Sequence, residues 1–215
     1  MRRATSRLPT PPLLVITDRS QARRSLDDTV AALLDGGARW ISLREKDLSP
    51  AARASQLARL VALARPFGAS VTVHADVDAA YAAGADGVHL PSGDDPAAAR
   101  RRLGDRALIG VSTHSLAEAE RAADAGADYV TLSPIFLSAS KPGYGPALGT
   151  AALAAAARRV AVPVIALGGI DASNARACRD AGGAGVAAMG EPMRAADPAA
   201  VMRALLEAWR TIRSR

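Results

Sequence analysis

Short apolar runs rich in β-branched residues alternate along this chain with longer segments in which apolar residues recur at helical spacing. Four of the runs close a repeated phrase in which glycine ends a helical segment and a strand-like run follows at once. These phrases span residues 35–43, 83–90, 124–132 and 180–188. Four further runs are Leu13 to Thr17, Ser70 to Val73, Ala107 to Val111 and Val164 to Leu167. The pattern predicts eight strands, each followed by a helix.

Helix-start residues support this division, as at Ser49-Pro50, Asp95-Pro96 and Asp171-Ala-Ser173. Eight βα units in 215 residues indicate a single-domain (β/α)8 TIM barrel of the α/β class. The alternative, an open doubly wound sheet, usually carries a glycine-rich phosphate-binding turn after its first strand. Here the first strand runs into Thr17-Asp18-Arg19. We therefore expect a barrel over residues 13–215 and a frayed or disordered tail over residues 1–12.

Composition narrows the classes of function. Hydrophobic residues make up 49% of the chain and aromatics 3%, so the core must consist of Ala, Val, Leu and Ile. No apolar run reaches the roughly 18 residues of a membrane span, and residues 1–12 lack the apolar stretch of a secretion signal. With a single cysteine, Cys178, these features predict a cytoplasmic protein. The net charge of +6 comes from arginines spread along helical segments, which favours phosphorylated small molecules over nucleic acid or membrane as partners; a homodimer is left open.

Candidate site residues follow the predicted strands, because barrel enzymes place their chemistry at the carboxyl ends of the strands. All three histidines of the chain, His74, His89 and His114, lie at such positions, and we expect at least one of them in an active site. The glycine-bearing turns after the last two strands, Gly168-Gly169 and Met189-Gly190, would present backbone N–H groups to one phosphate.

A long segment, Leu132 to Gly149, separates the sixth strand from its helix. Segments of this length usually grip or cover a ligand. Lys141 lies within it, and Lys141 and Lys46 are the only lysines among the 27 basic residues. The segment is therefore predicted to close over the ligand.

Several phrases in this order resemble the thiamine phosphate synthase and TenI superfamily over nearly the whole chain. The phrases are Leu14-Val-Ile-Thr-Asp18, Leu43-Arg-Glu-Lys46, Gly84-Ala-Asp-Gly-Val-His-Leu90, Gly110-Val-Ser-Thr-His114, Ser133-Pro-Ile-Phe136 and Val162-Pro-Val-Ile-Ala-Leu-Gly-Gly-Ile170.

The resemblance implies the following chemistry for the synthases. A pyrimidine diphosphate loses pyrophosphate, and the nitrogen of a thiazole phosphate captures the resulting cation, while a basic clamp and a Mg2+ held by two aspartates neutralise the leaving group. By position, the resemblance assigns the clamp to Arg44, Lys46 and Lys141 and a diphosphate contact to Ser112. It assigns the loop that touches the thiazole phosphate to Ser138, Ala139 and Ser140, and the backbone cradle of that phosphate to Gly169, Met189 and Gly190.

This chain departs from the synthase pattern near the pyrimidine. Ser42 stands where the family has glutamine, and His74-Ala75 stands where it has Asn-Asp. One magnesium carboxylate is thereby lost, and Asp94 remains as a metal ligand only if the chain works like a synthase, with Asp76 as a substitute for the missing group.

These departures favour a TenI-like thiazole tautomerase, which needs no cofactor, in which His114 moves the proton and Lys141 assists. The alternatives are thiamine phosphate synthase with Mg2+ and a non-catalytic ligand-binding or regulatory barrel. A zinc site at His74, His89 and His114 is a further, weaker hypothesis.

Overall fold

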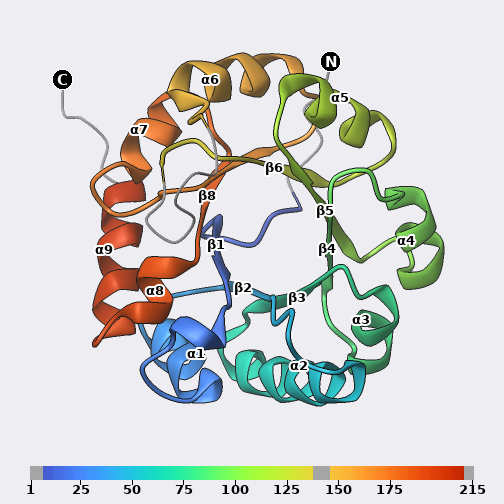
Figure 1. Ribbon diagram of the computed structural model, residues 1–215, viewed down its shortest axis with the longest axis vertical. Helices are drawn as coiled ribbons and strands as arrows, with labels where there is room; N and C mark the ends of the chain where they lie inside the picture. The colour runs from blue at the N-terminus through green and yellow to red at the C-terminus, as the bar shows by residue number, and fades with distance from the viewer. Residues whose placement is uncertain (1–6, 138–145, 211–215) are drawn as a thin grey trace.

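Eight parallel strands close into a barrel in chain order, and helices surround it on the outside (Figure 1). This computed structural model describes residues 7–137 and 146–210. The strands are β1 (Leu13–Ile16), β2 (Trp40–Leu43), β3 (Ser70–His74), β4 (Gly87–Leu90), β5 (Leu108–Thr113), β6 (Tyr129–Leu132), β7 (Val164–Leu167) and β8 (Gly185–Ala188). The predicted TIM barrel is confirmed. The bounds of β1, β3, β5 and β7 agree within two residues with the predicted runs, and the other four strands lie at the ends of the four repeated phrases.

A helix follows each strand, and β8 is followed by two, α8 (Gly190–Arg194) and α9 (Pro198–Arg210). The other helices are α1 (Leu26–Asp35), α2 (Pro50–Ala64), α3 (Val77–Ala83), α4 (Pro96–Leu103), α5 (Leu116–Asp124), α6 (Gly149–Arg159) and α7 (Ala175–Asp180), with short 3-10 turns η1 (Arg19–Gln21) and η2 (Arg65–Phe67). Within the described residues, no helix is both long and apolar enough to cross a membrane.

Each strand is buried on two sides, which explains its continuous apolar run. In β1, Leu13 and Val15 pack toward the helices, whereas Leu14 and Ile16 join a second cluster with Trp40 inside the barrel. Apolar side chains from β5, β6, β7, β8, β1 and β2 fill this interior, so the barrel has a packed core and its open space lies at the ends of the strands.

The predicted turn chemistry is largely present. Gly37, Gly84, Gly126 and Gly182 all have positive φ just after a helix. The side chains of Ser49 and Asp95 accept hydrogen bonds from the first turns of α2 and α4. The expected helix start at Asp171 is wrong by a turn: its carboxylate accepts from the Ser173 amide and hydroxyl, and α7 begins only at Ala175.

Residues 7–12 lie in the segment expected to be a tail, and they pack on the amino-terminal end of the barrel. Arg7 donates to the Asp105 carbonyl at 2.6 Å, and Leu8 contacts the inner apolar cluster. The Pro12 carbonyl accepts from Val186 N, which ties the segment to β8 before β1 begins.

Candidate functional site

Two cavities adjoin at the carboxyl ends of the strands. One has a volume of about 460 Å³ and lies against the ends of β7 and β8, and the other has about 220 Å³ and lies over β3, β4 and β5. Both are lined by Ile16, Arg44, Ser133 and Leu167, so a ligand in one cavity would meet a ligand in the other along this shared wall. We call them the glycine cavity and the histidine cavity.

The histidine cavity collects most of the residues predicted from the strand ends. Its walls include Ser42, Arg44, Lys46, His74, His89, Ser112 and His114. The strand register explains this grouping, because His74 pairs with His89 across β3 and β4 and parallel strands end at the same rim. All three histidines therefore share one cavity.

The glycine cavity contains the turns predicted to hold a phosphate, with Gly168, Gly169, Met189 and Gly190 in its walls. Gly169 has φ of 63°, and a Cβ at this position would clash with the Leu137 carbonyl oxygen. Asn174 donates to the Gly169 carbonyl at 2.8 Å and accepts from the Asp171 amide, which holds the turn after β7 in place. Only glycine fits such a turn without strain.

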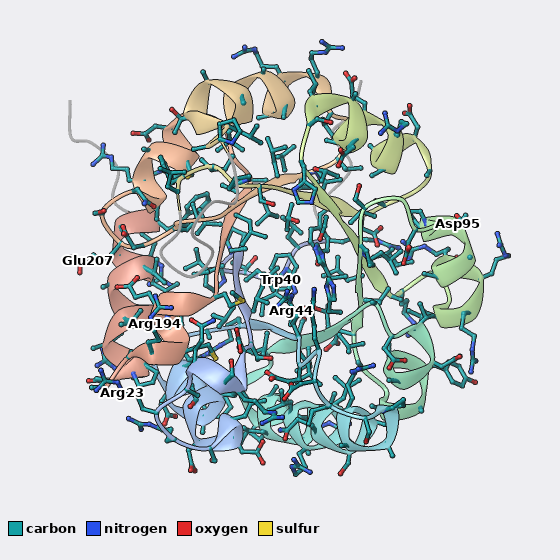
Figure 2. The ribbon with its side chains drawn as sticks, viewed as in Figure 1. Arg23, Trp40, Arg44, Asp95, Arg194 and Glu207 are labelled. Carbon is teal, nitrogen blue, oxygen red and sulfur yellow. The ribbon has the colours of Figure 1, made fainter. Side chains whose placement is uncertain are left out.

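Side chains of both charge signs line the glycine cavity. Arg194 of α8 lies against Gly190 and donates to Gln21, while Asp171 and Glu191 also line the wall. Burial and the Asp171 charge raise the pKa of Glu191, and Arg194 opposes them. Figure 2 shows Arg194 beside the barrel opening and Arg44 near its centre. Cationic groups thus approach the cavity from two directions.

Arg44 is held at the wall between the cavities by a buried relay. Its backbone N–H donates to Thr17 Oγ1 at 2.9 Å, and this hydroxyl donates to Glu45 Oε1 at 2.7 Å. The Glu45 carboxylate also accepts from the Arg19 amide at 3.0 Å. Burial raises the pKa of Glu45, against the hydrogen bonds from Thr17 and Arg19. The Arg44 guanidinium reaches across the rim to 4.0 Å from Met189 Sδ, so it faces both cavities.

His89 is the most enclosed of the three histidines, with 3% of its surface exposed. Its Nδ1 lies 3.0 Å from Tyr129 Oη and its Nε2 lies 2.9 Å from Ser112 Oγ. Burial, with the His74 charge in addition, lowers the pKa of His89 to about 3, so the ring is neutral near pH 7. Both ring nitrogens are directed at protein groups, although His89 was one of the three histidines predicted to form a substrate site at the strand ends.

His114 has a different environment. Its Nδ1 lies 3.0 Å from the Ser133 carbonyl oxygen, which can only accept, so Nδ1 carries a proton. In the neutral ring the basic lone pair is then on Nε2. The Glu118 carboxylate accepts from the His114 amide at 2.9 Å and from Ser92 Oγ at 3.0 Å. Although burial opposes them, these bonds lower the pKa of Glu118, so the carboxylate stays charged and orients the turn after β5.

Comparisons with known proteins agree with this arrangement. The family described as thiamine monophosphate synthase matches residues 13–191. The chain belongs to this family. A thiamine-phosphate synthase of Roseiflexus sp. (strain RS-1) is 43% identical over 193 residues, covering 89% of this chain and 82% of that protein. One of Roseiflexus castenholzii is 42% identical over 195 residues, covering 90% and 86%.

Among solved structures, a thiamine phosphate pyrophosphorylase from Pyrococcus furiosus superposes with a TM-score of 0.83 at 31% identity, covering 94% of this chain and 96% of that one. Each of these relatives is named as a synthase or pyrophosphorylase. The family prediction is therefore confirmed, whereas the preference for its TenI-like members is not supported, and the comparisons favour the alternative, a transferase.

The magnesium site that the synthase family implies does not fit the residues present here. Asp94 is exposed and lines neither cavity. Asp76 cannot stand in for the missing carboxylate, because it caps α3 through Ala79 N and pairs with Arg53 at 3.0 Å. In the described residues, no three His, Cys, Asp or Glu side chains are grouped so that they could hold a metal.

The histidines do not fit the hypothetical zinc site either. His89 directs both ring nitrogens at Tyr129 and Ser112, so it has no lone pair to offer to a metal that also contacts His74 and His114. Ala75 occupies the position of the missing carboxylate with φ of 63°, a conformation that costs energy for alanine.

Sequence reasoning missed some candidate positions. Glu45 was not singled out, although it stands between Arg44 and Lys46 and its carboxylate is buried against Thr17. Arg194 and Tyr129 lie in a short helix and inside a strand, where no local pattern marks them. Of the predicted residues, Ser138, Ala139, Ser140 and Lys141 lie outside the described part of the chain.

Proposed function

We propose that this chain is a thiamine-phosphate synthase, which joins a pyrimidine-methyl diphosphate to a thiazole phosphate and releases pyrophosphate. The observation that carries the proposal is the pair of cavities that share Arg44 as a wall. A transferase must hold two substrates with their reacting atoms in contact, whereas a tautomerase needs one site. The names of the relatives support the same choice.

The two substrates are assigned by charge and shape. The thiazole phosphate would occupy the glycine cavity, with its phosphate at the turns of Gly169 and Gly190. The pyrimidine diphosphate would occupy the histidine cavity, where Lys46 and Arg44 face its leaving group and Ser112 can donate to it. The thiazole nitrogen then meets the pyrimidine methylene beside Ser133, which lines both cavities.

The proposed reaction breaks the bond between the methylene carbon and the diphosphate oxygen, and the electron pair leaves with pyrophosphate. The thiazole nitrogen lone pair forms the new carbon–nitrogen bond. Negative charge grows on the departing diphosphate, and preorganised cations stabilise charge that develops in a transition state. We assign this role to Arg44 and Lys46. The relay through Thr17 and Glu45 holds Arg44 where that charge appears.

The test is incubation of the purified protein with both substrates while thiamine phosphate and pyrophosphate are measured together. We expect equal amounts of the two products. Arg44→Gln should lower turnover by about 100-fold or more, whereas Arg65→Gln, at an exposed arginine that follows α2 and lines neither cavity, should leave it unchanged. Absence of product from the wild-type protein would refute the proposal.

The tautomerase interpretation keeps one specific observation in its favour, the Nε2 lone pair that the Ser133 carbonyl imposes on neutral His114. It requires the protein to aromatise a thiazole carboxylate phosphate without any pyrimidine substrate, and His114→Gln to abolish that conversion. Binding of both phosphates with neither activity would instead support the non-catalytic barrel.

A further inference from the structure

A line of buried side chains runs from the barrel interior to the histidine cavity. Trp40 on β2 packs edge-on against Tyr129 on β6, with ring centroids 4.9 Å apart and planes at 76°. Tyr129 in turn stacks on His89 of β4 at 5.5 Å and 26°. The line ends at Ser112 on β5, which lines the cavity. Figure 2 shows Trp40 near the middle of the ring of strands.

The protons in this line are set by two simple constraints. His89 is neutral near pH 7, because burial and the nearby His74 lower its pKa to about 3, and a neutral imidazole has one donor and one acceptor nitrogen. Tyr129 keeps its proton, because burial and the Asp128 charge raise its pKa. Its buried hydroxyl must therefore donate to an acceptor.

The acceptor that the described residues offer to the Tyr129 hydroxyl is His89 Nδ1, at 3.0 Å. If Nδ1 accepts, then Nε2 must carry the ring proton. Nε2 then donates to Ser112 Oγ at 2.9 Å, with Thr131 Oγ1 at 3.3 Å as a second, longer partner. The opposite tautomer would leave the tyrosine O–H buried without an acceptor, which proteins rarely tolerate.

We propose that Tyr129 is a positioning residue that fixes His89 as the Nε2–H tautomer and so directs the Ser112 hydroxyl hydrogen into the histidine cavity. Because Ser112 Oγ receives a hydrogen bond from His89, its own hydrogen is available to a ligand oxygen. This arrangement favours a ligand that accepts a hydrogen bond from Ser112, such as an anion, over a ligand that donates one to it. That the anion is a diphosphate rests on the proposed function.

The tautomer is read directly by long-range 1H–15N NMR of the full-length protein at pH 7, since protonated and unprotonated ring nitrogens have well-separated 15N shifts. The His89 signals are assigned by comparison with a His89→Gln variant. We expect Nε2 to be protonated and Nδ1 to be unprotonated. The reverse assignment in the wild-type protein would overturn the proposal without reference to any activity.

The consequence for binding is tested with inorganic pyrophosphate as the probe, by titration calorimetry. Tyr129→Phe keeps the ring but removes the donor, and we expect affinity to fall about 5- to 10-fold. Ser112→Ala should lower the affinity by a similar factor. Adding Tyr129→Phe to Ser112→Ala should lower it no further, because both changes remove the hydrogen bond from the Ser112 hydroxyl to pyrophosphate. Additive losses would mean that Tyr129 acts only through packing, which would overturn the proposal.

Two controls keep the outcomes separate. Tyr81→Phe, at a tyrosine that is 58% exposed and lies in neither cavity, should alter neither the His89 signals nor the affinity. If the wild-type protein shows the Nε2–H tautomer yet fails to bind pyrophosphate, the tautomer assignment is supported and the proposed function is refuted. If Tyr129→Phe does not fold, the wild-type spectrum still decides the tautomer.

Discussion

Acidification should destabilise this protein through His89. Burial and the neighbouring His74 lower the pKa of His89 from 6.5 to about 3, so the folded state resists a proton that the unfolded chain accepts. Between these two values the unfolded state binds more protons, and stability therefore rises with pH. The contribution is fully present above pH 6.5 and is progressively lost as pH falls toward 3.

The size of the effect follows from the two pKa values. Proton linkage with 6.5 in the unfolded state and about 3 in the folded state gives a loss of about 2 kcal/mol between pH 7 and pH 5. This is a large share of the 5–15 kcal/mol that usually separates folded from unfolded domains. Most of the change falls below pH 6, where the unfolded histidine is mostly protonated.

The assay is urea denaturation at pH 5, 6 and 7 at constant ionic strength, followed by circular dichroism, for the wild-type protein and His89→Gln. Glutamine can still bond to Tyr129 and Ser112 but has no titration of its own. Other groups with shifted pKa values, Glu45 and Glu191 among them, titrate in both proteins and cancel in the difference. We expect the wild type to lose about 2 kcal/mol more than the variant between pH 7 and pH 5. Parallel pH profiles would refute the reasoning.

Three further predictions concern backbone positions at the rim. Ala75→Gly should raise the free energy of unfolding by about 0.5–1 kcal/mol, because φ is 63° there. Ala58→Gly, at an exposed position in the middle of α2, should instead lower it by about 1 kcal/mol, and urea denaturation measures both changes. Gly169→Ala should lower the free energy of unfolding by more than about 2 kcal/mol and weaken phosphate binding, because it adds a clash with the Leu137 carbonyl to an unfavourable φ. Gly126→Ala, where a Cβ meets open space, should lower the free energy of unfolding by about 1 kcal/mol. Ala75→Asp should make pyrophosphate binding depend more strongly on magnesium by calorimetry, and equal magnesium dependence in both proteins would contradict the proposed loss of a metal ligand.

The fold was predictable because its signals are local and repeated. Glycine-ended helices followed by short apolar runs occur throughout, and the positive φ of Gly37 and Gly126 shows that the pattern marks a real backbone requirement. The location of the site followed from the fold, since parallel strands bring their carboxyl ends to one rim. The helix start near Asp171 was wrong because an Asx-type turn and a helix cap have the same residue signature.

What the sequence could not reveal is which rim residues face a ligand and which face each other. His89 and His114 look equivalent in sequence, since each is at the carboxyl end of a run of branched residues. Their surroundings come from residues far along the chain: Tyr129 and Ser112 enclose the first, and the Ser133 carbonyl orients the second. Burial and hydrogen bonding between distant strands therefore assign different roles to the same side chain.

The departures from the family pattern at the end of β3 leave the fold unchanged, since β3 still pairs with β4 in a closed barrel. Ala75 keeps a left-handed backbone although alanine gains nothing from it, because its amide donates to the His89 carbonyl and Asp76 caps α3 just after it. Neighbouring hydrogen bonds therefore impose the conformation whatever side chain is present. It follows that a barrel and family match can persist while a metal carboxylate disappears. Under the proposed function, the positive charge that a departing diphosphate requires would come from Arg44 and Lys46, which line the histidine cavity.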